Sequence, residues 1–388
     1  MPVLRTTARR SKRTLITAAL ALAVVAGTGG WAAGSAQEAV TGPPPGATAW
    51  RADHSLGLPL PDPATAAPAD VARFFGSLTD RERHALAARH PLTVGNLDGV
   101  PVTLRYEANS LALKAERDFR RARAADPAGT LQDHQEARKA AARCADLLRP
   151  GRRILAFDPR GRGQVAEVYG DLTTAERTAM IVPGSDIDLA TFDRSNDPYG
   201  TPAGMATSLR AQMAADAPHT RTAVIAWAGY TTPVGVGPDA ATGRLAEAGA
   251  PRLARLLSGL AATEVPAPTV LCHSYGSVVC SLAAPGAGRG AIADLVVFGS
   301  PGMRRDTVAE LRTTARVWAA RDASDWIGDV PNVELLGLGH GEDPTDPAFG
   351  ARRVSAERAD GHTGYLAPGT DSRRNFAAIA LGRYGDVR

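Results

Sequence analysis

Residues 269–279, TVLCHSYGSVV, decide the fold of this chain. The apolar and β-branched residues at the start predict a buried strand, and the small and apolar residues at the end predict a helix. Between them, Ser274 is the centre of a small-x-Ser-x-Gly turn, with Cys272 and Gly276 at the two positions that must be small. A strand, a tight turn and a helix in this order are typical of a nucleophile elbow, which exposes its serine above a helix N-terminus.

Two features surround this turn. Cys272 stands where the elbow pattern has glycine, and a cysteine side chain is compact enough to fit there. His273 adjoins the serine, but neighbouring residues in an elbow point apart, so we expect it to be a packing residue. The chain has three cysteines, so at least one thiol stays free, and their spacings match no zinc-binding pattern.

From residue 151 to the end, short apolar runs alternate with amphipathic helical stretches. This pattern predicts an α/β fold in which a mostly parallel sheet is flanked by helices. The apolar run at 293–299 suits a parallel strand that is buried on both faces. The expected strands are 153–157, 164–169, 179–182, 223–227, 269–272, 295–298, 315–319 and 333–338, and the expected helices include 243–260, 278–284, 306–313 and 372–381.

Three segments precede this domain, which we place at 151–388. Residues 70–150 are rich in Ala, Leu, Arg and Glu and predict a helical preface, with a capping box that begins at Thr79 and a break near 126–127. Residues 37–69 hold repeated prolines among Ala, Gly and Thr, so we expect a semi-rigid Pro/Ala-rich linker there.

Residues 1–36 have the three parts of a secretory signal peptide: a basic run, an apolar core and the small residues 34–36. We therefore expect a secreted protein with no stable membrane span after cleavage. The alternative is an uncleaved N-terminal anchor with the body facing outside, because residues 15–33 carry no charge.

Charge and composition exclude several classes of protein. The 388 residues have a formal net charge of +4, but the leader holds five basic residues and no acid, so the rest is at −1, the +4 less those five. We therefore expect no nucleic-acid partner. A hydrophobic fraction of 44% and a charged fraction of 22% exclude a mostly disordered chain.

A nucleophilic serine needs a base to take its proton and an acid to orient that base, in the chain order Ser, acid, His for an elbow of this kind. Asp325 follows the second expected strand beyond the elbow and is our choice for the acid, with Asp322 as the alternative. Two histidines compete for the base. We favour His362, which lies close to glycines before the closing helix, over His340, which directly follows the strand expected at 333–338.

The oxyanion hole is expected to combine two backbone N–H groups, those of Tyr275 and Ser185. Ser185 follows the strand expected at 179–182, and Gly184 before it lets the backbone approach the substrate. No cofactor is expected.

Acidic residues cluster after His340, at Glu342, Asp343 and Asp346. Such a cluster either binds a calcium ion or holds a loop through turns. The prolines at 344 and 347 favour turns, so we expect no metal site.

Together these stretches resemble the alpha/beta-hydrolase domain of unknown function that is common in actinobacterial proteins. The resemblance covers most of residues 70–382 and implies a Ser-Asp-His hydrolase of unassigned substrate, with Ser274, Asp325 and His362 as its triad. The matching stretches are 94–101 (VGNLDGVP), 181–184 (IVPG), 273–277 (HSYGS), 343–350 (DPTDPAFG) and 361–365 (GHTGY).

The sequence therefore predicts an exported serine hydrolase that cleaves an ester through an acyl-enzyme, with a small-molecule or lipid ester as substrate. Carboxylesterase- or lipase-like chemistry is favoured, and an amidase or peptidase would use the same residues. The alternative from another class is a non-catalytic cell-envelope binding module on the same fold. Its ligand affinity would survive the loss of Ser274, whereas turnover by a hydrolase would collapse.

Overall fold

The computed structural model describes residues 36–388. The predicted signal peptide at 1–36 therefore lies, apart from its last residue, outside the described residues. Within residues 36–388, no helix is both long enough and apolar enough to cross a membrane.

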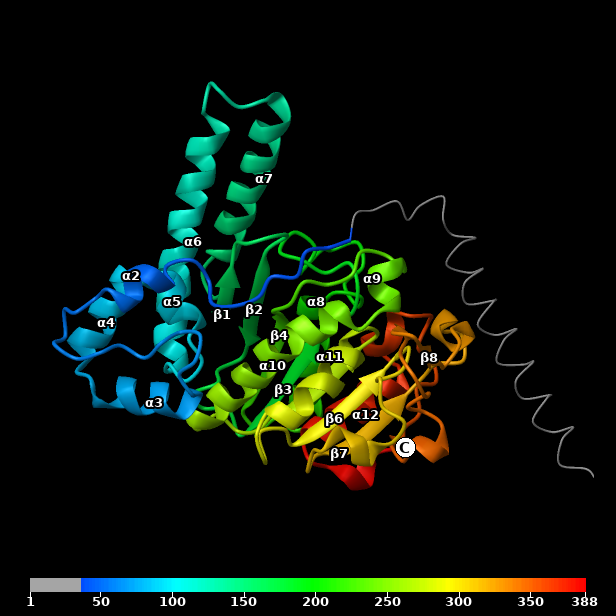
Figure 1. The fold of residues 1–388 in the computed structure, drawn as a ribbon. Coiled ribbons are helices and arrows are strands. Elements are labelled where there is room, and N and C mark those ends of the chain that lie inside the picture. Colours follow the sequence, from blue (N-terminus) through cyan, green and yellow to red (C-terminus); the bar gives the residue numbers. More distant parts are fainter. Residues whose placement is uncertain (1–35) are drawn as a thin grey trace, which may run out of the picture.

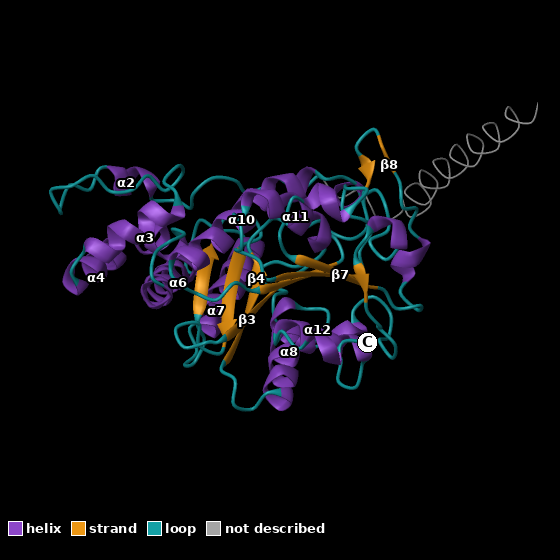
Figure 2. Ribbon diagram, turned by 90° about the horizontal axis from the view of Figure 1, so that it is seen from below, coloured by secondary structure: helices purple, strands orange, loops and turns teal. Residues whose placement is uncertain are grey.

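The centre of the fold is an eight-stranded sheet in the order β1-β2-β4-β3-β5-β6-β7-β10 (Figures 1 and 2). The β1–β2 and β2–β4 pairs are antiparallel, and all pairs beyond β4 are parallel. This confirms the predicted α/β fold with a mostly parallel sheet. The strands are β1 (Ile154–Asp158), β2 (Gln164–Tyr169), β3 (Arg177–Val182), β4 (Thr222–Ala228), β5 (Thr269–His273), β6 (Asp294–Phe298), β7 (Arg316–Ala320) and β10 (Arg352–Arg353).

Helices cover both faces of the sheet (Figure 2). Every residue of β4, β5 and β6 is buried, as expected for strands packed on both faces. The apolar sides of the helices supply the two core clusters, one on each face. The first face is covered by α10 (Arg244–Ala262) and α11 (Gly276–Ala283), and the second by α8 (Pro202–Asp216) and α12 (Asp371–Ala380).

The N-terminal helices form a separate unit beside β1, with a small core of its own (Figure 1). The capping box at Thr79 is present, and the chain breaks between α6 and α7 where the sequence predicted. These two helices form a hairpin that extends away from the sheet (Figure 1). The helices of this unit are α2 (Ala47–Arg51), α3 (Pro68–Ser77), α4 (Asp80–Arg89), α5 (Pro91–Asn96), α6 (Val102–Ala124) and α7 (Leu131–Leu147).

The N-terminal unit is hydrogen-bonded to the edge strand β1. The Asn96 side chain donates to the carbonyl of Phe157 at 2.8 Å and accepts from its N–H at 3.1 Å. Arg105, which is buried, donates to the carbonyl of Leu155 at 3.0 Å. Side chains therefore satisfy backbone groups that an edge strand would otherwise leave unpaired.

The segment 37–69 differs from the predicted spacer because it packs on the rest of the chain. Trp50 is fully buried, and its indole N–H donates to the carbonyl of Pro61 at 2.8 Å. Closer to the N-terminus, the Val40 N–H donates to the Thr231 hydroxyl at 3.0 Å. Residues 37–69 therefore form a proline-rich segment that packs against the folded domain.

Two expected elements after β6 are also corrected. The strand expected at 333–338 is a small antiparallel hairpin outside the main sheet, β8 (Glu334–Leu335) and β9 (Leu338–Gly339). The helix expected at 306–313 is one 3-10 turn, η2 (Val308–Leu311). In the first of these stretches the chain reverses at Leu336 and Gly337, which both have positive φ. The other short elements are α9 (Pro238–Ala241), η1 (Ala284–Gly286), η3 (Trp326–Asp329), η4 (Pro347–Phe349), η5 (Gly364–Leu366) and η6 (Tyr384–Asp386).

Candidate active site

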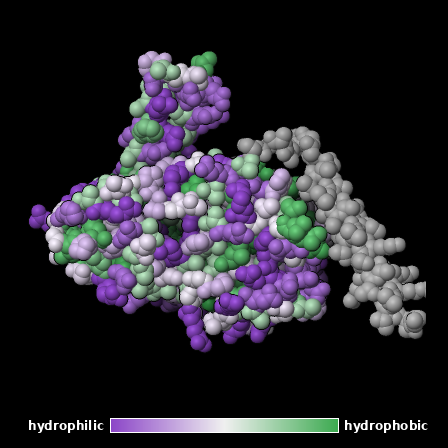
Figure 3. Space-filling model, in the orientation of Figure 1, coloured by the Kyte–Doolittle hydropathy of each residue, from purple (hydrophilic) through white to green (hydrophobic). Residues whose placement is uncertain are grey.

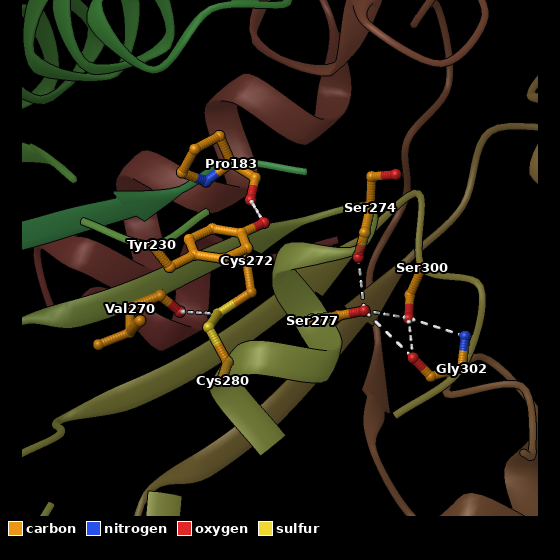
Figure 4. The surroundings of a disulfide bond; sticks show 9 residues. All are labelled: Pro183, Tyr230, Val270, Cys272, Ser274, Ser277, Cys280, Ser300 and Gly302. Atoms are coloured by element: carbon orange, nitrogen blue, oxygen red, sulfur yellow. Dashed lines mark hydrogen bonds between the residues drawn. A yellow bond between two sulfur atoms is a disulfide. The ribbon is translucent and has the colours of Figure 1, made fainter. Parts of the chain in front are cut away.

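Ser274 lies in the turn between β5 and α11, as the elbow pattern predicts. Its φ of 53° is in the left-handed region, which a non-glycine residue adopts only when its surroundings hold it there. The Ser274 N–H donates to the carbonyl of Phe298 at 3.0 Å, and the Ser277 hydroxyl donates to the Ser274 carbonyl at 2.7 Å (Figure 4). These bonds fix the turn on both sides of the serine.

Two glycines let the backbone come close to this turn. A Cβ on Gly276 would lie 2.5 Å from the carbonyl oxygen of Val182, which is far inside contact distance. A Cβ on Gly184 would lie 2.6 Å from the Ser274 Cβ. The loop after β3 therefore passes directly beside the serine, as the sequence predicted for Gly184.

A disulfide joins Cys272 to Cys280 and so links β5 to α11 across the elbow (Figure 4). Both residues are buried, and Cys144, which is also buried, is the free cysteine. Cys272 is thus more than a compact substitute for glycine. The sequence carried no signal for this pairing.

His362 lies between Ser274 and Asp325. Its Nε2 is 2.8 Å from the Ser274 Oγ, and its Nδ1 is 2.8 and 3.1 Å from the two carboxylate oxygens of Asp325. In this arrangement the ring accepts the serine proton at Nε2 and donates from Nδ1–H to the carboxylate. The structure therefore brings the three residues named from the sequence into one hydrogen-bonded chain.

Asp325 is buried, yet it is held in the ionised form. Burial opposes ionisation, but hydrogen bonds from His362, from the Tyr365 hydroxyl and from the Ile327 N–H outweigh it and lower the pKa of Asp325. The Tyr365 hydroxyl donates to Asp325 Oδ2 at 2.6 Å. Burial and the neighbouring carboxylate raise the pKa of Tyr365 above its ordinary value, so this hydroxyl stays a donor.

Tyr365 is a site residue that sequence reasoning missed. It lies in the 361–365 stretch that carries the family resemblance, three residues after His362. Its contact with Asp325 joins residues 40 apart in the chain, so spacing alone could not reveal it.

His273 forms a hydrogen bond to the backbone of His362. It is buried, and its Nε2–H donates to the backbone carbonyl of His362 at 2.7 Å. Burial, together with the nearby His362, lowers the pKa of His273 to about 3, so the ring stays neutral. The packing role expected for His273 is therefore also a positioning role.

Asp322 and His340, the alternatives for acid and base, lie outside this hydrogen-bonded chain. Asp322 accepts from the N–H and hydroxyl of Ser324 in a turn. His340 is buried, and its Nε2–H donates to the carbonyl of Ala240 at 2.7 Å. Burial lowers the pKa of His340 to about 4.

The acidic residues after His340 take turn-forming roles. Asp343 accepts from both the N–H and the hydroxyl of Thr345, and Asp346 accepts from the N–H of Ala348. These contacts favour the turn interpretation over a calcium site.

Two backbone donors border the serine. In the part of the chain that the structure describes, neither the Tyr275 N–H nor the Ser185 N–H has a hydrogen-bond partner. The Ser185 loop is held by the buried Tyr230, whose hydroxyl donates to the carbonyl of Pro183 at 2.8 Å (Figure 4). Free donors on a fixed backbone are what an oxyanion hole requires.

A separate cavity of about 490 Å³ lies between residues 41–44, β1 and α10. Its lining includes Arg105, Asp158 and Arg252, and none of the three residues of the hydrogen-bonded chain. The Arg252 guanidinium lies 3.5 Å from the Asp158 carboxylate. This cavity lies between the N-terminal unit and the sheet, apart from Ser274.

Comparison with known proteins agrees with this fold. A family model described as "Alpha/beta hydrolase" matches residues 158–335, which include Ser274 and Asp325. The chain has the alpha/beta-hydrolase fold, and residues 158–335 match that family. This match supports a hydrolase and agrees with the resemblance found in the sequence.

Two curated relatives come from Mycobacterium tuberculosis. They are "Uncharacterized protein MT2140" of strain CDC 1551 / Oshkosh and "Uncharacterized protein Rv2079" of strain ATCC 25618 / H37Rv, each 32% identical over 390 residues. The alignment covers 85% of this chain but 58% of each relative, so the chain spans little more than half of their length.

Among solved structures, this chain matches the 2,6-dihydroxy-pseudo-oxynicotine hydrolase at 12% identity, with 89% of this chain and 93% of that chain covered and a TM-score of 0.34. Another is AbyA5, which is 14% identical, with 80% and 95% covered and a TM-score of 0.36.

Proposed function

We propose that this alpha/beta hydrolase is a serine hydrolase that cleaves an ester bond through an acyl-enzyme. The observation that carries the proposal is the His362 ring, which is within hydrogen-bond distance of the Ser274 hydroxyl on one side and of Asp325 on the other. A serine hydroxyl is a weak nucleophile unless a base takes its proton. This arrangement provides that base and fixes its tautomer.

The reaction proceeds in two balanced halves. Ser274 Oγ attacks the ester carbonyl while its proton passes to His362 Nε2, and the N–H groups of Tyr275 and Ser185 stabilise the oxyanion. The imidazolium then protonates the alcohol as it leaves, which gives the acyl-serine. Water attacks the acyl-serine with His362 as base, releases the carboxylic acid and restores the hydroxyl. Asp325 stays ionised throughout and stabilises the imidazolium, and no cofactor takes part.

We also propose that the enzyme works outside the cell membrane, as the leader pattern indicates. The binding-module alternative rested on the presence of Cys272 and on rival histidines. Cys272 is engaged in a disulfide and His340 in a backbone contact, so neither observation favours that alternative.

Steady-state hydrolysis of a small chromogenic ester tests the proposal. We expect Ser274→Ala and His362→Asn each to lower kcat by about 10⁴-fold or more. His340→Gln is the matched control, because a glutamine amide can still donate to the Ala240 carbonyl, and it should stay within about tenfold of the parent. Full activity in Ser274→Ala, or an equal loss in the two histidine variants, would contradict the proposal.

A further inference from the structure

Exposed hydrophobic side chains gather at the edge of the sheet that holds Ser274. Among residues 36–388, nine large hydrophobic side chains are exposed, and six of them lie on the loops after β4 and β7. These strands run parallel to β5, so their carboxyl ends meet at the same edge. We call these six residues the apolar rim: Val234, Val236, Trp326, Leu335, Leu336 and Leu338.

One part of the apolar rim contacts the site, and a second part adjoins it. The Trp326 ring packs against the His362 ring with their centroids 4.8 Å apart, and Trp326 is still 45% exposed. Between the two valines, the Gly235 N–H donates to the Asp186 carboxylate at 2.8 Å, next to Ser185. The rim is therefore continuous with the base and with the loop beside the serine.

The third part is the β8–β9 hairpin, which projects from the body (Figure 2). Leu338 bridges to Thr242, whose carbonyl accepts the Tyr275 hydroxyl at 2.7 Å. Figure 3 shows a hydrophobic patch over the region that Figure 1 labels β8. The hairpin is thus linked through Thr242 to Tyr275, the residue that directly follows Ser274.

Leu336 at the hairpin tip is unfavourable for the isolated protein. It is 95% exposed, and both central residues of the turn have positive φ, 53° for Leu336 and 83° for Gly337. Such turns favour Asn, Asp or Gly at these positions. A leucine here costs free energy through its backbone and through its contact with water, and it packs on nothing in return. An unfavourable residue with no compensating gain in the fold indicates a contact outside it.

The hairpin is held firmly in this position. Arg304 donates to the carbonyls of Gly337 and Gly339 at 3.3 and 3.2 Å, and it pairs with Glu334 at 2.7 Å. The only carboxylate of the hairpin, Glu334, is therefore paired with a cation. What the tip presents outward is aliphatic.

We propose that the apolar rim docks on the surface of aggregated lipid, so that the substrate is an acyl ester delivered from that surface to Ser274. A protein partner seated on the rim would cover the serine, whereas a lipid surface would supply the ester to it. A protruding leucine has no facing wall with which to enclose a single chain, but it can enter a lipid surface. The substrate class rests on the proposed function; the docking surface does not.

Flotation with phosphatidylcholine vesicles tests docking without turnover. The protein is residues 36–388, which contain every described element, with Ser274→Ala to prevent hydrolysis. We expect Leu336→Asn to lower the vesicle partition coefficient about tenfold, since it removes one inserted aliphatic side chain. The same change should raise Tm, because Asn suits the left-handed turn.

Leu131→Ser is the matched control, since Leu131 is 80% exposed at the start of α7, on the hairpin that extends from the sheet. It should leave the partition coefficient unchanged. Docking at the rim is refuted if the parent does not float, or if Leu336→Asn floats as well as the parent.

A second assay separates the two proposals. With an active protein, we expect the rate on one acyl ester to rise at least severalfold when its concentration passes the aggregation point. Hydrolysis without this rise and without vesicle binding would overturn the docking proposal and leave the hydrolase intact. Vesicle binding with no hydrolysis of any ester would overturn the proposed function alone.

Discussion

Ser274 and Leu336 both have positive φ, but different surroundings hold them there. Ser274 is fixed by hydrogen bonds to its own N–H and carbonyl, by two close glycines and by the disulfide across the turn. A left-handed conformation costs a non-glycine residue about 1–2 kcal/mol, and these contacts offset that cost. Leu336 has only the turn and the Arg304 contacts to the neighbouring carbonyls.

The phenol of Tyr365 positions Asp325, the proposed acid of the triad. Tyr365→Phe removes the donor to Asp325 Oδ2 and leaves the carboxylate free to turn away from His362. We expect kcat to fall about tenfold with KM nearly unchanged, because the lost contact serves the reacting geometry and not substrate binding. Tyr384→Phe is the matched control, since that hydroxyl donates to the buried Asp294 at 2.9 Å. Equal kinetics in the two variants would contradict the positioning role.

At the level of single residues, the sequence predicted that Ser274, Asp325 and His362 lie together, but not which other side chains hold them in place. The order Ser, acid, His follows from the topology, so Ser274, Asp325 and His362 could be named. The contacts of Tyr365 and His273 depend on side-chain directions in loops, which no periodic pattern records. The backbone contact that engages His340, and so distinguishes it from His362, likewise has no signal in the sequence.

The elbow as an element is tied together by the Cys272–Cys280 disulfide. The bond links a strand to the helix that follows it in the chain. The two cysteines are eight residues apart, so the loop that the bond closes is short. Sequence reasoning could not find it, because three cysteines allow three pairings and the spacing carries no preference.

Removing this bond should destabilise the protein. For a loop this short we expect Cys272→Ala with Cys280→Ala to lower the free energy of unfolding by about 2–3 kcal/mol. Urea unfolding with and without reductant measures the effect. In Cys144→Ser, which keeps the bond, reductant should still lower the free energy of unfolding as in the parent. Stability that is unaffected by reductant would contradict this role for the bond.

Other elements were predicted well where a pattern was long and poorly where it was short. The buried strands β4 to β7 and the helices α10 and α12 follow from apolar runs and helical periodicity. The stretch 333–338 has apolar residues in a strand-like run, but Gly337 and Gly339 turn it into a hairpin. The hydrogen bonds between Asn96 and β1 join residues 61 apart and have no sequence signature.

For the molecule as a whole, burial of two neutral histidines makes stability depend on pH. Burial lowers the pKa of His273 to about 3 and of His340 to about 4. Unfolding exposes both rings, which then take up protons near their ordinary pKa of about 6.5. The unfolded chain therefore binds more protons between about pH 4 and 6.5, so the free energy of unfolding falls as pH falls through this window.

Each histidine contributes a slope of about 1.4 kcal/mol per pH unit there. Urea unfolding at several pH values between 4.5 and 7 measures this slope. His340→Gln should reduce this slope by about 1.4 kcal/mol per pH unit, whatever its effect on the free energy of unfolding at pH 7. The same slope in parent and variant would show that His340 does not titrate on unfolding.

The whole-molecule architecture was predicted in its class and its layers, but not in how the N-terminal segments pack. Proline-rich composition at 37–69 suggested a spacer, yet Trp50 is fully buried in the N-terminal core. The composition of a segment indicates how stiff it is but not whether it packs against the rest of the protein. A single buried aromatic residue, here Trp50, is enough to hold the stiff segment in place.

Labelling with a fluorophosphonate tests the central claim most directly, because this reagent reacts with a serine that a neighbouring base has activated. We predict that the folded protein is labelled on Ser274, that Ser274→Ala abolishes the label, and that His362→Asn slows labelling by several orders of magnitude. A folded protein that takes no label, or a label that persists in Ser274→Ala, would contradict the claim that His362 and Asp325 activate this serine.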